Sequence, residues 1–404
     1  MSVLKFGTYI NLSYAFTLSR RCLWILGIWP DPFVPLSDFQ RLSVRFIIVT
    51  CILCLYVIVP QLTNTIHAWG NVARMVQHVA SANFSLMALC KLVGTCYHGQ
   101  TLRVLMTSVM TDWMTSKDHE RSTMLSIAKR GRALALRCYM ASSCTVLFGF
   151  SLHVLKYHRN KHQPHRPLMY EFNFPYNTEK SPSYEITVLT QLSGGMYSAL
   201  INSTIDCFVS ILLLHICAQL KNLRTMLNKL VDDLAKKVIS SAEFKERLAT
   251  ITMRHEHLIR NAKTVDDCYS AVLFIHMLAA TFQLCFESFQ VFTIVSNHLN
   301  ISVIRVAFLS FYVVLVLTHL YIYCYSAERL LIESTGMAYG VYECKWYDIS
   351  SKDAKSLMFM AYRSAIPLKL TAGKFGTFSL EMFGTTVKTS MGYLSALLTM
   401  MDKT

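Results

Sequence analysis

Residues 46–73 read FIIVTCILCLYVIVPQLTNTIHAWGNVA and contain no Asp, Glu, Lys or Arg. A helix that crosses about 30 Å of hydrocarbon needs roughly 20 mostly apolar residues, and this stretch is long enough. The same absence of charge recurs further along the chain, at 138–155, 186–205, 268–286 and 306–327. Two weaker segments complete the pattern, at about 75–97 and about 375–401. The sequence therefore predicts an all-α polytopic membrane protein with seven transmembrane helices.

The composition and the charge distribution agree with this fold class. Of the 404 residues, 53% are hydrophobic and only 16% are charged, which excludes a disordered or an ordinary soluble protein. The net charge of +15 is typical of nucleic-acid binding, of membrane-surface binding or of cytoplasmic loops. The segments between the predicted spans place 24 Lys and Arg residues on one side of the bilayer and six on the other. We therefore expect a cytoplasmic N-terminus, an extracellular C-terminus and no nucleic-acid partner.

The chain lacks the short motifs of several enzyme classes. It contains no phosphate-binding GxxxxGK loop, no GxSxG nucleophile elbow, no HExxH zinc motif and no pair of CxxC motifs. We therefore expect neither an enzyme nor a metal site nor a cofactor. The fourth to sixth spans continue without Pro into basic segments such as 221–260, so their helices are expected to extend beyond the membrane.

A ligand pocket is expected in the outer half of the predicted bundle, where aromatic and Met side chains concentrate with few polar groups. Such a lining suits a small apolar ligand, although each of these residues taken alone is more typical of an ordinary core. The candidate pocket residues are Phe84, Met87, Thr145, Phe148, Gln191, Tyr197, Phe308, Phe311 and Tyr312.

The last predicted span carries a polar stripe. The stripe consists of residues at steps of four, three, four and three, which helical geometry places on one face: Lys388, Gly392, Ser395, Thr399 and Asp402. A polar stripe inside a membrane needs water or a partner. The stripe is typical of two structures: a contact between neighbouring helices, or a pore wall with a constriction near Ala396. A pore requires several copies of the chain around one axis, and hence an oligomeric channel.

From Tyr323 onward the chain resembles an insect odorant receptor. The motifs that carry this resemblance are CYSAE at 324–328, ES at 333–334, AY at 338–339, WY at 346–347, PLKLTAGKF at 367–375, SLEMF at 379–383 and KTSMGY at 388–393. The earlier two-thirds of the chain is similar to that family only in its length, number of spans, orientation and long outer loop after the third span.

The resemblance implies a ligand-gated, non-selective cation channel in the plasma membrane of olfactory sensory neuron dendrites. It further implies a hetero-oligomer, a tetramer, in which a tuning subunit such as this one combines with a shared co-receptor and binds small volatile ligands. The cytoplasmic ends of the fourth to seventh helices would join the subunits. The gate would lie near Ala396, with Thr399 and Met400 next along the pore.

We expect a single membrane domain over 1–404 with four parts. Residues 1–41 form a cytoplasmic or interfacial segment, 42–326 the first six helices with the pocket, 327–374 a cytoplasmic anchor region, and 375–401 the pore helix. Asn300-Ile-Ser302 is a glycosylation sequon in a predicted outer loop.

Three alternatives to an odorant receptor stay open at this point. A G-protein-coupled receptor also has seven helices, but the charge bias of this chain is the reverse of its orientation. A related gustatory receptor is the second alternative, although the closing motifs fit the odorant branch better. A secondary transporter would show helices interrupted by Gly or Pro near the middle of the membrane, and Gly194-Gly195 is the one feature of that kind.

Overall fold

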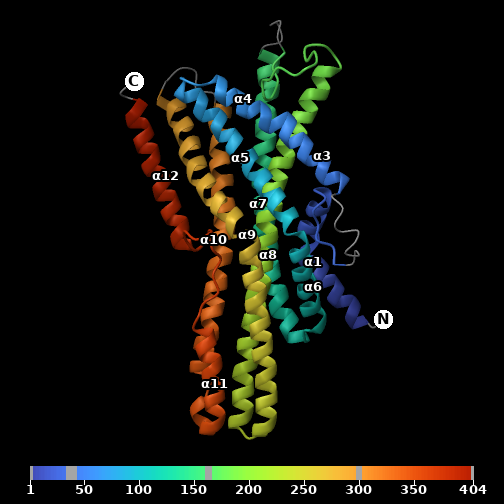
Figure 1. Cartoon of the computed structure of the whole chain (residues 1–404), viewed down its shortest axis with the longest axis vertical. Coiled ribbons are helices and arrows are strands. Elements are labelled where there is room, and N and C mark those ends of the chain that lie inside the picture. Colours follow the sequence, from blue (N-terminus) through green and yellow to red (C-terminus); the bar gives the residue numbers. More distant parts are fainter. Residues whose placement is uncertain (1–2, 33–42, 160–165, 297–302, 402–404) are drawn as a thin grey trace.

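The computed structural model describes residues 3–32, 43–159, 166–296 and 303–401. Within these ranges the chain is mostly helical and contains no β-strand (Figure 1). The helices are α1 (Val3–Ile25), α3 (Val44–Leu53), α4 (Val59–His67), α5 (Val72–Tyr97), α6 (Gly99–Thr115), α7 (Asp118–Arg159), α8 (Ser183–Ala235), α9 (Ser241–Ser296), α10 (Val303–Glu343), α11 (Ser351–Ser364) and α12 (Leu380–Met401), with a π turn at Cys54–Ile58 and a 3-10 turn at Trp346–Asp348.

Six helical segments are long and apolar enough to cross a membrane. They are Val44–His67, Arg74–Tyr97 and the helices α7, α8, α9 and α10, and they confirm six of the seven predicted spans. The seventh, α12, is less apolar because Lys388 and several Ser, Thr and Gly residues interrupt its hydrophobic side chains. Its 22 residues still reach about 33 Å at 1.5 Å per residue, which matches the thickness of the hydrocarbon.

Helix α8 lies at the centre of the bundle. It contacts α1, α5, α7, α9 and α10, and every residue from Ile201 to Ala218 is buried. A helix that is hydrophobic and buried on all sides is typical of the middle of a helical bundle. Any polar side chain on this part of α8 must therefore find its partners inside the protein.

Helix α1 packs onto this bundle. Phe16, Leu23 and Leu26 are buried in the main core, whereas Arg20 and Arg21 are exposed. The helix contacts α6, α7 and α8. The exposed side of this helix also carries Trp24 and Ile25, at 58% and 43% exposure, so its apolar residues are only partly covered by protein.

The chain reverses direction between α11 and α12. Ala372 N donates to Gly376 O at 2.8 Å and Phe378 N to Leu370 O at 2.8 Å, and Gly373 adopts a φ of 57°, a left-handed conformation that favours glycine. Asp266 of α9 fixes this turn by accepting hydrogen bonds from the backbone N and the hydroxyl of Thr371. Helix α12 therefore begins at Leu380, and not near residue 375 as predicted, because the preceding residues form this turn.

The lower end of the molecule in Figure 1 consists of the ends of α8 and α9 with α11 beside them. Ser350 caps α11 and donates to Asp353, which also accepts from Ser241 at the start of α9. Burial raises the pKa of Asp353, but these hydrogen bonds and the Lys245 ammonium outweigh it and hold the pKa below the usual value. Asp353 is therefore charged at neutral pH and ties α11 to α9.

Candidate ligand pocket and buried polar network

A cavity of about 360 Å³ lies in the upper half of the bundle. Its wall is formed by α4, α5, α7, α8, α10 and the segment that precedes α8. This volume is within the range of about 300–1,000 Å³ that is usual for small-molecule pockets. The lining residues are Gln61, Gln77, Ser81, Phe84, Ser85, Ser142, Thr145, Val146, Gly149, Leu152, His153, Lys156, Leu168, Met169, Tyr170, Leu192, Gly195, Ser198, Ala199, Phe308, Tyr312 and Leu315.

Four of the nine predicted pocket residues line this cavity, namely Phe84, Thr145, Phe308 and Tyr312. Phe84 and Tyr312 contact each other edge to face, with ring centroids 5.5 Å apart. Met87 lies deeper and lines a second, smaller cavity together with Phe84. The structure thus brings five of the nine residues to two neighbouring spaces that share Phe84 as a wall.

The other four predicted residues are absent from the walls of both cavities. Phe148 stacks on Phe311 with centroids 4.8 Å apart, and Phe311 is 41% exposed on the single chain. Tyr197 packs against the main core. Gln191 is fully buried, and its amide binds the backbone of Met169 and Tyr170.

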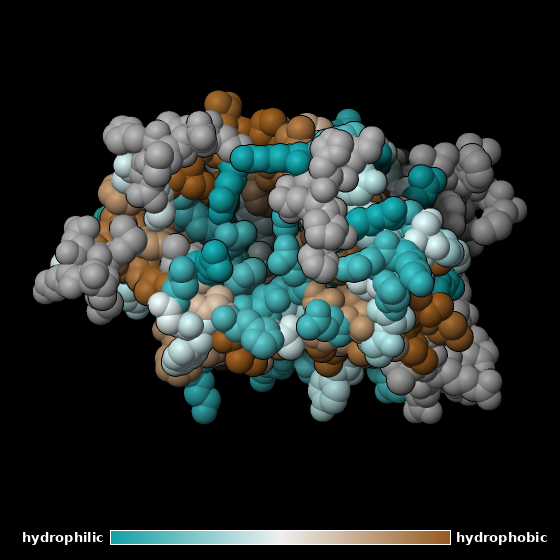
Figure 2. All heavy atoms as spheres, turned by 90° about the horizontal axis from the view of Figure 1, so that it is seen from above, coloured by the Kyte–Doolittle hydropathy of each residue, from teal (hydrophilic) through white to brown (hydrophobic). Residues whose placement is uncertain are grey.

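Gln191 therefore shapes the pocket from outside it. Its Oε1 accepts from Met169 N at 3.1 Å and Tyr170 N at 3.2 Å, and its Nε2 donates to Tyr170 O at 2.7 Å. These bonds hold the segment before α8 over the cavity, and Leu168, Met169 and Tyr170 complete the wall. Seen from above, polar residues gather over the middle of this end and apolar residues lie toward its edges (Figure 2).

Sequence reasoning missed much of the polar side of the wall. Gln77, Ser81 and Ser85 follow one another at steps of four on α5, on the same face as Phe84. That periodicity could have identified them once Phe84 was chosen. Leu168, Met169 and Tyr170 carry no such signal, because a segment outside the helices follows no helical repeat.

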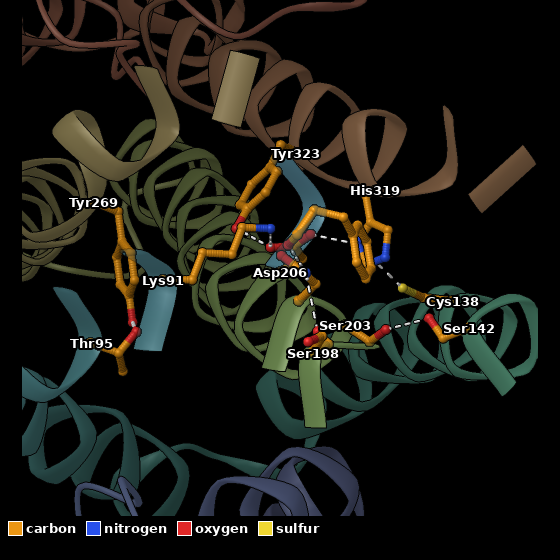
Figure 3. Close-up of polar contacts among 12 residues, drawn as sticks. Lys91, Thr95, Cys138, Ser142, Ser198, Ser203, Asp206, Tyr269, His319 and Tyr323 are labelled. Carbon is orange, nitrogen blue, oxygen red and sulfur yellow. Dashed lines mark hydrogen bonds and ion pairs between the residues drawn. The ribbon is translucent and has the colours of Figure 1, made fainter. Parts of the chain in front are cut away.

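A second group of polar residues is buried at the centre of the bundle, below the pocket. Asp206 of α8 accepts hydrogen bonds from Lys91 of α5 and Tyr323 of α10, and its other oxygen lies 2.6 Å from His319 Nδ1 (Figure 3). The side chains of Lys91 and Asp206 are 0% exposed. Charged residues at this depth are costly and are retained where they pair with one another.

This network joins α5, α8 and α10, which are far apart in the sequence, so no local sequence pattern connects them. Lys91 lies inside the weak span at 75–97, and Asp206 follows directly after the charge-free segment 186–205. A single acid and a single base in two apolar helices are a signal for a pair, which the sequence analysis did not draw. Further buried hydrogen bonds lie along α8. Ser203 bonds to Ser142 of α7, and Ser210 bonds to Ser326 of α10 at 2.6 Å.

The second cavity, of about 30 Å³, lies between the pocket and this network. Phe84 separates it from the pocket, and Asn83, Gln283, His276 and His319 lie in its wall. Asn83 Nδ2 donates to Gln283 Oε1 at 2.8 Å. Polar groups of α5, α9 and α10 thus face one another directly behind an aromatic residue of the pocket.

The predicted pore residues lie far from the pocket, on α12. Lys388, Gly392, Ser395, Ala396 and Thr399 are all exposed on the single chain. The opposite side of α12 contains the buried Thr386 and Ser390, and Val387 packs against a cluster on α9 and α10. The side chain of Met400, the stripe residue Asp402 and the sequon residue Asn300 are outside what the structure describes.

The family model and the curated relatives that match this chain point to the same family. A family model described as 7tm Odorant receptor matches residues 71–391. Odorant receptor 13a of Drosophila melanogaster is 25% identical over 244 residues, which cover 57% of this chain and 57% of that receptor. The odorant receptor coreceptor of Aedes aegypti is 27% identical over 144 residues, or 36% of this chain and 29% of the coreceptor. The matched part is thus a little over half of the first relative and under a third of the second.

The fold is also that of a solved structure. The insect olfactory receptor OR5 from Machilis hrabei, in complex with eugenol, aligns with a TM-score of 0.79 and covers 97% of this chain and 99% of its own. The sequence identity is 16%, so this likeness concerns the fold alone.

Proposed function

The chain belongs to the 7tm odorant receptor family, and from this premise we propose that it is the tuning subunit of an odorant-gated, non-selective cation channel. It binds a small volatile ligand in the 360 Å³ cavity and assembles with the shared co-receptor as a heterotetramer. The family and the six apolar helices make it a multi-pass membrane protein. We place it in the plasma membrane of olfactory neuron dendrites, with the N-terminus in the cytoplasm and the cavity in the outer half.

The observation that carries this proposal is the cavity of about 360 Å³ in the upper half of the helical bundle. Its wall combines aromatic and aliphatic side chains with nine Gln, Ser, Thr, His and Lys side chains, and a concave wall of this mixed kind suits a small organic molecule. No catalytic step is required. A ligand that binds the open state more tightly than the closed state shifts the population toward conduction.

The exposed face of α12 supports the pore. Its Lys388, Ser395 and Thr399 have no cover from the rest of the described chain, although polar groups at membrane depth need water or a partner. Several copies of α12 around a shared axis would give these residues a water-filled channel. Ala396 is a small residue on this face, so we assign the tightest seal of the assembled channel to the partner subunits.

Contacts from the central network to the base of α12 offer a route from pocket to gate. Tyr323, a partner of Asp206, packs against Phe378 with ring centroids 5.9 Å apart. Leu380 N, at the start of α12, donates to Glu328 of α10 at 3.1 Å. A shift of α10 or α5 on ligand binding would therefore reach α12 through packed side chains.

The four-part division of the chain fits this function. We assign 1–41 to a cytoplasmic or interfacial segment, 42–326 to the helices that hold the pocket, 327–374 to the anchor between subunits, and 375–401 to the pore helix. Neither the family nor the fold favours a G-protein-coupled receptor. Gly194, the transporter-like feature, lies where α8 crosses Ile52 and Val57, and a side chain there would meet Val57.

Electrophysiology tests the proposal directly. The chain and the co-receptor are expressed together and separately in oocytes, and currents are recorded during application of a panel of volatile compounds. We expect cation currents only with both subunits, and their ligand preference should follow this chain. Currents that are the same with and without this chain would exclude the tuning role.

A cysteine variant tests the pore in the same cells. Ala396→Cys should make the currents sensitive to a charged methanethiosulfonate reagent, because residue 396 lines the conduit. Val387→Cys is the matched control, since Val387 packs against α9 and α10. Insensitivity of the Ala396→Cys channel, or equal modification of both variants, would remove α12 from the pore.

A further inference from the structure

The polar groups of the pocket wall differ in whether they already have partners. Four hydroxyls in its deeper part donate to a backbone oxygen four residues earlier, at 2.9–3.3 Å, and they belong to Ser81, Ser85, Thr145 and Ser198. A hydroxyl has one hydrogen to donate, so none of these four can donate to a ligand without breaking that bond.

His153 and Lys156 line the outer end of the cavity, about one turn apart on α7. Neither side chain is closed off by its neighbours, since His153 is only partly buried and the Lys156 side chain is 48% exposed. The His153 ring has no hydrogen-bond partner in the described chain, and Lys156 is the charged neighbour that acts on it. This end of the wall therefore has nitrogen groups that a ligand can reach.

Lys156 is the one charged side chain among the described residues of the wall, and none of those residues is an Asp or a Glu. Its ion-pair partner Glu171 lies outside the wall, with Nζ and Oε1 2.7 Å apart, and the Glu171 side chain is 71% exposed. An ion pair this exposed contributes little stability, because water screens it. An ammonium carries three N–H donors on a flexible stem, so Lys156 can bind a further acceptor in the cavity.

The outer end of the cavity is therefore basic, and a basic end distinguishes ligands by charge. Arg305 adds a second cation there, since its Nη2 donates at 3.1 Å to Oε1 of Gln77, which lines the cavity. A cationic amine would face Lys156 without any carboxylate in the described wall. A neutral ester can accept a hydrogen bond but leaves the positive charge uncompensated. A carboxylate does both, and charge-assisted hydrogen bonds are about twice as strong as neutral ones.

We infer that the pocket selects small carboxylic acids in their ionised form, and that Lys156 and His153 bind the carboxylate at the outer end. The apolar chain of the acid extends inward to Phe84 and Phe308. The lining residues of α7 run from Ser142 to Lys156, about 21 Å along the helix at 1.5 Å per residue, which leaves room for such a chain. This inference rests on the proposed function and adds the chemical class of the ligand.

Three probes with the same number of heavy atoms test this inference at neutral pH: octanoic acid, its isomer methyl heptanoate, and nonan-1-amine. We expect the wild-type channel to respond to octanoic acid at a concentration at least tenfold lower than to the other two. Lys156→Met should raise the half-maximal concentration for octanoic acid by tenfold or more and change that for methyl heptanoate by less than about threefold. A tenfold change corresponds to about 1.4 kcal/mol. Lys156→Arg keeps the charge and should retain the preference for the acid.

Glu171→Gln separates ligand binding from a purely structural role of the ion pair. It breaks the same pair as Lys156→Met, so both variants would weaken all responses alike if the pair only held the segment before α8 in place. Glu171 instead competes with the ligand for the Lys156 ammonium. Glu171→Gln should therefore lower the half-maximal concentration for octanoic acid, by about threefold, whereas Lys156→Met raises it.

Arg166→Met is the matched control. It breaks another exposed ion pair at the same end of the bundle, with Glu185 at 3.4 Å, and Arg166 is absent from the cavity wall. All three responses should stay unchanged. Shifts in the same direction for Lys156→Met and Glu171→Gln, or a wild-type preference for methyl heptanoate or nonan-1-amine, would overturn the inference.

A binding measurement separates this inference from the channel assignment. Octanoic acid should raise the unfolding temperature of the purified chain in detergent, and Lys156→Met should abolish that increase. This result without any ligand-gated current would refute the channel and leave the ligand class standing. Equal stabilisation of wild type and Lys156→Met by octanoic acid, with currents intact, would refute the carboxylate site and leave the channel standing.

Discussion

At the scale of single residues, Asp206 has more buried partners than any other charged residue that we describe. Lys91, His319 and Tyr323 come from two different helices and converge on its two oxygens. A buried charge that loses its partner costs far more than the pair contributes. The consequences of removing Asp206 and of removing Lys91 should therefore differ.

We predict that Asp206→Leu is the more damaging of the two substitutions. It leaves Lys91 as an unpaired buried charge and removes the acceptor of Tyr323 and His319, a loss of about 3–5 kcal/mol for a broken buried pair. Lys91→Met should cost less, because Asp206 keeps two donors. Thermal unfolding of the detergent-purified variants measures both. Glu256→Gln, which breaks an exposed pair with Arg260, is the control, and equal losses in Asp206→Leu and Glu256→Gln would refute the role of the network.

At the scale of helices, close contact between α8 and α10 depends on two glycines one turn apart. A Cβ added at Gly340 would lie 2.6 Å from Cγ of Arg224, near the root of that side chain. A Cβ at Gly336 would lie 2.7 Å from Arg224 Nη1, at its flexible end. The two positions therefore tolerate a methyl group to different degrees.

Gly340→Ala should destabilise the protein, because α8 and α10 must move apart or Arg224 must leave its groove. Overpacking of this kind costs about 1–3 kcal/mol, which exceeds the gain of about 1 kcal/mol in helix propensity. Gly336→Ala should cost less. Gly384→Ala in α12 is the control, since its Cβ would meet nothing within 4 Å. This variant should be stabilised, because alanine has the higher helix propensity. The unfolding temperature ranks the three variants, and a stabilised Gly340→Ala protein would contradict this account.

At the scale of the whole molecule, α11 carries an apolar face that no part of the described chain covers. Phe359 and Tyr362 are each 81% exposed, and Ile366, just beyond the end of α11, is 61% exposed, whereas Leu357 and Met360 on the other face are buried. Exposed apolar faces of this kind mark interaction sites. The face lies in the region 327–374 that we propose to join subunits.

Phe359→Glu should weaken co-purification with the co-receptor at least tenfold without changing the folding of the chain itself. A charge placed in an apolar interface loses its hydration, whereas on the free subunit it faces water. Val238→Glu is the matched control, since Val238 is 69% exposed between α8 and α9. Unchanged recovery of the complex with Phe359→Glu would remove this face from the interface.

The sequence by itself predicted the helical fold class and the six apolar segments that are long enough to cross a membrane. A membrane-spanning helix pairs all its backbone groups within itself, because hydrocarbon offers no other partner. It therefore appears in the sequence as one uncharged segment of about 20 residues. The closing motifs pointed to the family, and periodicity located Phe84, Thr145, Phe308 and Tyr312, which the structure places in one cavity wall.

The tertiary structure alone decided which residues meet. Lys91 and Asp206 are 115 residues apart, and the Gln191 amide holds a segment more than 20 residues before it over the pocket. The physical reason is that burial and hydrogen-bond partnership belong to the packed bundle, whereas a sequence pattern reports only neighbours within a few helical turns.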